Sequence, residues 1–109
     1  MDIVCDKRAG GTLLQVNGRM DAVYAPAFEK ECLLVIDGGE IKVVVDLTGL
    51  EYISSAGLRS ILVSAKKAKV KGCSIQFCGV SGMVEEVFKI SGLFTLFSIV
   101  PTVEEAFAA

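Results

Sequence analysis

The chain has 109 residues, of which 52% are hydrophobic, and a formal net charge of -2. This length and composition predict a single domain, residues 1–109, with enough apolar material to cover both faces of a sheet. The charge balance excludes the broad positive field that nucleic acids and anionic membranes attract, so we expect neither as a partner.

The first third of the chain predicts a hairpin followed by a helix. Residues 3–8 and 12–17 lie on either side of a Gly-Gly pair, which is typical of two strands joined by a tight turn. Residues 18–21 are expected to break the second strand. Pro26 suits the first turn of a helix, and apolar residues then recur at helical spacing, so we predict a helix over residues 26–36.

The rest of the chain alternates strands and helices. The β-branched run in residues 41–47 is typical of a strand buried on both faces, and residues 48–53 are expected to connect it to a helix over residues 55–70. Further elements are predicted as a strand over residues 74–78, a helix over 81–90, a strand over 94–100 and a short helix over 101–107, with Thr102 as its N-cap. This order predicts an α/β fold, a mixed β-sheet with about four helices packed against it.

The N-terminus and the cysteines bear on location. Residues 1–8 alternate in polarity and carry acids before any apolar run, unlike a signal peptide, and the apolar runs are shorter than the about 20 residues of a membrane span. Cysteines occur at four positions without a CxxC spacing, and we expect buried, reduced thiols. These are Cys5, Cys32, Cys73 and Cys78. A cytoplasmic protein is expected.

The turn before the helix over residues 55–70 carries the candidate site. Two residues with hydroxyl groups, Ser54 and Ser55, lie at the predicted start of this helix, and Gly57 follows two residues later. A helix N-terminus presents unpaired N–H groups and partial positive charge, so a serine there can cap the helix, and a phosphate there is held favourably. From the residues alone, both roles stay open for Ser55. Asp46 and Thr48 are expected to shape the preceding loop.

Residues 43–62 resemble the STAS domain of bacterial anti-sigma-factor antagonists, with Asp46-Leu47, Tyr52-Ile53 and Ser54-Ser55-Ala56-Gly57-Leu58 in register. The likeness extends over nearly the whole chain. It includes the opening hairpin, the turn Gly18-Arg19-Met20-Asp21 and the terminal helix that contains Glu-Glu-Ala. The resemblance implies a STAS-like fold and a part in a partner-switching pathway.

In that family an anti-sigma factor that is also a serine kinase phosphorylates a serine at the start of this helix. That position falls on Ser55, with Ser54 as the alternative acceptor. The resemblance implies that the unphosphorylated protein binds the kinase and so releases a sigma factor, that phosphorylation blocks binding, and that a serine phosphatase resets the protein. The residues carried over as partner contacts are Asp21, Ser54, Ser55, Ala56, Gly57, Leu58 and Arg59.

Several of these residues have a second interpretation. Asp21 is equally suited to an Asx turn that supports the following helix, and Gly57 to close packing in the core. Ser54 stands where the family usually has Asp, and Arg59 where it often has a small residue.

Two other classes of function were weighed. Ser55 as the nucleophile of a hydrolase lacks both the Gly-x-Ser-x-Gly motif and any histidine, so we expect no enzyme, cofactor or metal. The remaining alternative is a STAS scaffold or nucleotide-binding module in a signalling or transport complex outside sigma-factor control. We expect a monomer, although the helix face near Leu58 and Ser55 could support a weak dimer.

Overall fold

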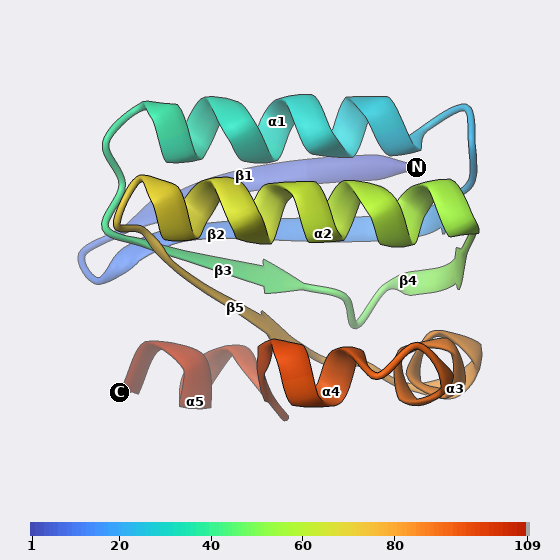
Figure 1. Ribbon diagram of the computed structural model, residues 1–109. Coiled ribbons are helices and arrows are strands. Elements are labelled where there is room, and N and C mark those ends of the chain that lie inside the picture. Colours follow the sequence, from blue (N-terminus) through green and yellow to red (C-terminus); the bar gives the residue numbers. More distant parts are fainter. Residues whose placement is uncertain (109) are drawn as a thin grey trace.

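The computed structural model of the protein describes residues 1–108, which form a mixed β-sheet with helices on both faces (Figure 1). The strands are β1 Asp2–Arg8, β2 Gly11–Met20, β3 Lys42–Asp46, β4 Leu50–Ile53, β5 Ser74–Cys78 and β6 Ser98–Val100. The helices are α1 Ala25–Asp37, α2 Ser55–Val70, α3 Gly82–Ile90, α4 Leu93–Leu96 and α5 Val103–Ala108. The predicted α/β class with a mixed sheet is confirmed.

The long strand β2 organises the sheet, whose order is β1-β2-β3-β5-β6. β1 and β2 form the predicted antiparallel hairpin, and every other pairing is parallel. The first half of β2 pairs with β3 from Thr12 to Gln15, and its end pairs with β4 after a register shift at Gly18 and Arg19. Gly18 has a φ of 97°, a conformation that glycine adopts without steric cost. One strand therefore supports two parallel neighbours.

Three predictions of secondary structure were wrong. Residues 18–21 do not break the second strand, because β4 supplies new hydrogen-bond partners up to Met20. Residues 48–53 are not all loop, because residues 50–53 form β4. The strand predicted over residues 94–100 is shortened to β6 by the preceding α4, so the described residues contain five helices, one more than the about four expected.

The buried residues of β3 divide between two core layers, as its continuous apolar run predicted. Val43 and Val45 belong to the main core, which also contains buried residues of α1 and α2. Val44 points to the opposite face because side chains alternate along a strand. There it packs with Leu13, Cys78 and Ala106, the last of these from α5. The sheet is covered on both faces at its centre.

The cysteines follow the prediction at three of four positions. Cys32, Cys73 and Cys78 are buried, and burial raises the pKa of Cys32 to about 11 and that of Cys78 to about 12. Cys5 is exposed on the edge strand β1, so the expectation of burial was wrong there. A side chain on an edge strand has a neighbouring strand on one side only, so it is covered less. The local sequence pattern predicts a strand but does not show that the strand lies at the edge of the sheet.

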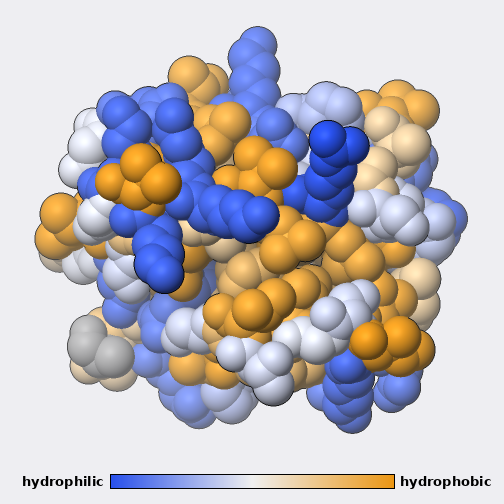
Figure 2. Space-filling view, in the orientation of Figure 1, coloured by the Kyte–Doolittle hydropathy of each residue, from blue (hydrophilic) through white to orange (hydrophobic). Residues whose placement is uncertain are grey.

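Apolar side chains also reach the surface. Figure 2 shows them gathered between α2 and α4, where a groove of about 290 Å³ opens. It is lined by Leu62, Ala65, Lys66, Lys69, Ile75, Leu96, Phe97 and Ser98. Within residues 1–108, each helix is too short or too polar to cross a membrane.

Candidate functional site

Parallel pairing of β2 and β4 brings two distant segments of the predicted site together. Met20 pairs with Ile53 at the ends of these strands, and Ser54 N donates a hydrogen bond to Met20 O at 2.9 Å. Because the carboxyl ends of parallel strands meet at one edge of a sheet, Asp21 and Ser54 follow side by side. The turn after β2 and the start of α2 therefore form one surface.

Ser54 is the residue that caps α2. Its backbone is extended, with φ -90° and ψ 173°, and its Oγ accepts a hydrogen bond from Gly57 N at 3.1 Å. Its carbonyl oxygen accepts the hydrogen bond from Leu58 N at 2.9 Å, the first of the helix. The capping role left open for Ser55 thus belongs to Ser54, and Ser and Asp are comparably good N-cap residues.

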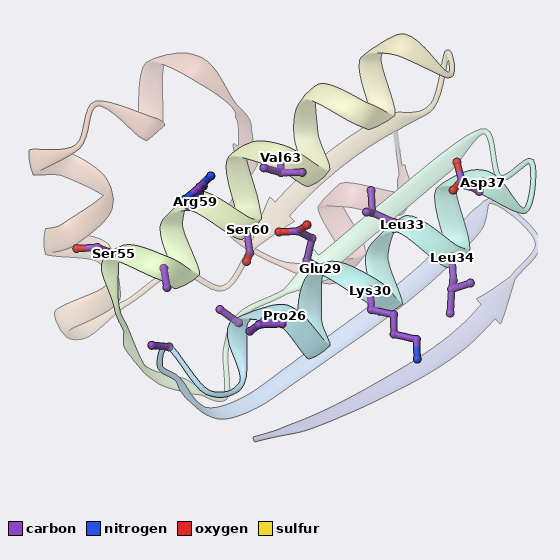
Figure 3. A pocket seen from close by; sticks show the side chains of 13 residues that line it. Pro26, Glu29, Lys30, Leu33, Leu34, Asp37, Ser55, Arg59, Ser60 and Val63 are labelled. Atoms are coloured by element: carbon purple, nitrogen blue, oxygen red, sulfur yellow. The ribbon is translucent and has the colours of Figure 1, made fainter.

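Ser55 is the first residue of α2, and its side chain is exposed. Within the described residues its hydroxyl has no hydrogen-bond partner. Figure 3 shows that this hydroxyl is directed away from α1. The first turn of α2 contains no acidic residue, so no carboxylate of that turn repels an anion there. Ser55 is therefore the accessible hydroxyl of the pair.

Asp21 forms the Asx turn that was one of its two interpretations. Its Oδ1 accepts hydrogen bonds from Val23 N and Tyr24 N, both at 3.0 Å, and its carbonyl oxygen accepts one from Ala25 N at 2.9 Å. The side chain is half-buried. Asp21 thus fixes the entry into α1, because its side chain holds two N–H groups of the turn before the helix and its carbonyl oxygen holds that of Ala25, the first helical residue.

Gly57 packs in the core. A Cβ at this position would lie 2.7 Å from Ile53 Cγ1 and 3.0 Å from Met20 O, so no side chain fits without movement. The close approach of α2 to the end of β2 explains this glycine without any partner. Gly57 itself is buried, and its contact with a partner stays a prediction.

The remaining predicted contact residues differ in exposure. Arg59 is exposed, whereas Ala56 and Leu58 are half-buried and pack against the main core. All three lie within the first two turns of α2, beside the Asp21 turn. Ser55 and Arg59 are thus the exposed members of the predicted set.

A groove between α1 and α2 begins at this surface (Figure 3). Its volume is about 840 Å³. The α2 wall contains Ser55 and Arg59, and Glu29 of α1 points across toward Ser60. The lining residues are Ala22, Ala25, Pro26, Glu29, Lys30, Leu33, Leu34, Asp37, Ser55, Ala56, Arg59, Ser60 and Val63.

The α1 wall of this groove was not predicted as part of the site. Exposed apolar residues flank the site as well, since Val23 is 78% exposed and Tyr24 is 45% exposed directly after the Asp21 turn. Leu34 and Val63 add exposed apolar surface along the groove. In the sequence, this part of the surface could have been recognised from the apolar pair Val23-Tyr24, which directly follows the Asp21 turn.

Asp46 shapes the loop between β3 and β4, as expected. Its Oδ1 accepts hydrogen bonds from Thr48 N at 3.0 Å and Thr48 Oγ1 at 2.6 Å. Gly79 lies against this pair, since a Cβ there would approach Asp46 Oδ1 to 3.0 Å. Asp46 and Thr48 are structural parts of the loop. Residues 1–108 contain no group of three His, Cys, Asp or Glu residues suited to hold a metal ion.

Comparison with known proteins agrees with this fold. The family model of the STAS domain matches residues 2–106. BtrV of Bordetella bronchiseptica, whose name describes it as an anti-sigma factor antagonist, is 37% identical over 109 residues, which are 100% of this chain and 94% of that protein.

Two solved structures illustrate the same likeness. An anti-sigma factor antagonist from Mycobacterium paratuberculosis has a TM-score of 0.89 at 22% identity, covering 98% of this chain and 91% of that one. The phosphorylated form of SpoIIAA, a Bacillus cell fate determinant, has a TM-score of 0.76 at 16% identity, covering 98% and 97%. The resemblance found in the sequence is confirmed, and the chain belongs to the STAS domain family.

Proposed function

We propose that this protein is an anti-sigma-factor antagonist whose binding to an anti-sigma factor is controlled by phosphorylation of Ser55. The observation that carries the proposal is the division of roles at the start of α2. Ser54 Oγ is engaged as the N-cap, whereas the Ser55 hydroxyl is exposed and has no hydrogen-bond partner within residues 1–108. A kinase can therefore reach Ser55 without breaking the cap.

The surface around Ser55 suits a protein partner. Exposed apolar side chains at Val23 and Tyr24 adjoin the Asp21 turn, and the groove between α1 and α2 extends from Ser55. Apolar and aromatic groups beside a groove are typical of protein interfaces. The anti-sigma factor, itself a serine kinase in this proposal, docks on this surface when Ser55 is unmodified and then releases its sigma factor in the cytoplasm.

Phosphorylation would oppose that docking. A phosphate adds about two negative charges and a bulky group at the edge of the interface. A partner surface that fits a neutral hydroxyl then offers no group of its own to pair with the added phosphate, so docking must desolvate the phosphate without compensation from the partner, which weakens binding. Removal of the phosphate by a serine phosphatase restores the binding form. Among structural neighbours, SpoIIAA has been solved in a phosphorylated form, which supports the same chemistry here.

The test uses the anti-sigma kinase of the same organism, ATP and mass spectrometry. We expect one phosphate on Ser55 in the wild-type protein, none in Ser55→Ala, and normal phosphorylation in the control Ser81→Ala, an exposed serine before α3. Ser55→Ala should bind the kinase and Ser55→Asp should bind it more weakly. Phosphate on Ser54 alone, or equal binding of both Ser55 variants, would contradict the proposal.

A second candidate is a STAS scaffold outside sigma-factor control. The observation that favours it is the apolar groove between α2 and α4, which contains Leu62 and Leu96 and does not include Ser55. In that case a partner would bind regardless of the state of Ser55. Binding that is lost in Leu96→Glu but equal in Ser55→Ala and Ser55→Asp would select the scaffold.

A further inference from the structure

Arg59 lies on α2 one turn after Ser55. Residues four apart are neighbours on a helix surface, and both of these side chains are exposed. Both also belong to the wall of the groove between α1 and α2. A negative group that precedes a positive group by four residues is the more favourable order on a helix.

The guanidinium of Arg59 has no ion-pair partner within residues 1–108. The ion pairs found there join Arg8 to Asp6 and both Lys67 and Lys71 to Asp37. In Figure 3, Glu29 points from α1 toward Ser60, while the guanidinium of Arg59 is directed away from α1. Among the residues that the structure describes, Arg59 is thus a free cation, and its long side chain can turn toward Ser55.

We propose that Arg59 binds the phosphate of Ser55 within the same molecule. The proposal rests on the proposed function, since it requires a phosphate at Ser55. A guanidinium offers paired N–H donors that match two phosphate oxygens, and such charge-assisted hydrogen bonds are stronger than neutral ones. Phosphorylation then changes two exposed groups at once, because the Ser55 hydroxyl is lost and the Arg59 cation is occupied.

The same pairing is disfavoured for Ser54. Arg59 follows Ser54 by five positions, which places the two about 140° apart around the helix axis, whereas Ser55 and Arg59 are about 40° apart. The Ser54 side chain is also turned toward Gly57 N. Arg59 therefore distinguishes a phosphate on Ser55 from one on Ser54.

The test places phosphoserine at position 55 by genetic encoding, so that no kinase is needed. The second pKa of the phosphate, about 6 when unperturbed, is followed by phosphorus NMR. We expect this pKa to be about half a unit lower in the otherwise wild-type protein than in Arg59→Gln, because a nearby cation favours the dianion. Lys66→Gln is the matched control, since Lys66 is exposed on the same helix about three turns from Ser55.

Equal phosphate pKa values with and without Arg59 would overturn the inference. A shift of the same size in Lys66→Gln would also overturn it, because the effect would then be general screening by the helix. Phosphoserine encoded at position 54 should show no dependence on Arg59, and the same dependence there would refute the assignment to Ser55. Failure of the kinase to modify Ser55 would instead reject the proposed function and leave the encoded phosphate measurements intact.

Discussion

Ser54 Oγ accepts a hydrogen bond from Gly57 N at 3.1 Å, while the next hydroxyl along the chain, that of Ser55, is exposed. Two adjacent serines therefore have different tasks. One stabilises the helix and the other is available for modification. Substitutions at the two positions should separate stability from regulation.

Ser54→Ala should lower the free energy of unfolding by about 1 kcal/mol, because loss of an N-cap leaves a helix donor unsatisfied. Ser55→Ala, the matched control, should change it by less than about 0.5 kcal/mol, since the side chain is exposed. Urea denaturation followed by circular dichroism measures both values. A larger loss in Ser55→Ala than in Ser54→Ala would show that Ser55, and not Ser54, caps the helix.

Gly57→Ala should lower the free energy of unfolding by about 1 kcal/mol. Alanine usually stabilises a helix by about 1 kcal/mol relative to glycine, but a Cβ here would lie 2.7 Å from Ile53 Cγ1, and overpacking costs about 1–3 kcal/mol. Ala27→Gly on the exposed face of α1 reports the ordinary helix preference in this protein. A stabilised Gly57→Ala variant would show that α2 can move away from the end of β2.

Asp21→Ala should lower the free energy of unfolding by about 1 kcal/mol, because two backbone N–H groups lose the same acceptor. Asp21→Asn keeps a side-chain oxygen and should recover most of the loss. Asp2→Ala, at an exposed position in β1, is the control and should have little effect. Thermal and urea denaturation give the values, and an unchanged Asp21→Ala would refute the role of this turn in starting α1.

The buried thiols should make stability fall at high pH. Burial raises the pKa of Cys32 from 9.0 to about 11 and that of Cys78 from 9.0 to about 12, with the Asp46 carboxylate adding to the shift at Cys78. The folded state then keeps protons that the unfolded chain releases, so this stabilisation is complete below about pH 9 and is lost as the pH rises toward 11 and 12.

Urea denaturation at pH 8 and pH 10 measures this loss. The decrease should be smaller in Cys32→Ala and in Cys78→Ala than in the wild-type protein. Cys5→Ala should keep the full decrease, because Cys5 is exposed. An equal decrease in all three variants would show that other groups govern the alkaline behaviour.

Strong local patterns made most of the fold predictable. The bounds of α2 and β5 agree with the sequence prediction, and Thr102 caps α5, since its Oγ1 accepts a hydrogen bond from Glu105 N at 3.1 Å. A buried strand, an amphipathic helix and a cap residue each depend on neighbours in the sequence. Such elements do not require knowledge of the tertiary structure.

The errors occurred where tertiary contacts decide the conformation. The four residues of β4 become a strand because the end of β2 lies beside them, and the sequence of that segment alone also suits a loop. The roles of Ser54 and Ser55 were open for a related reason. The helix bounds were right, but only the position of Gly57 N relative to Ser54 Oγ shows which hydroxyl is engaged.

The change of partner along β2 also limits how the chain can vary in length. The register of β4 against β2 sets where α2 begins, because the pair of Met20 and Ile53 is followed directly by the hydrogen bond from Ser54 N to Met20 O. A one-residue slip would also turn the core-facing side chains of β4 to the other face. The loop before β4 is held as well, because Gly18 N donates a hydrogen bond to Gly49 O at 2.9 Å and Asp46 Oδ1 accepts two from Thr48. An insertion between Leu50 and Ser54 would break this register, so relatives that keep the serine in place should keep the length of β4.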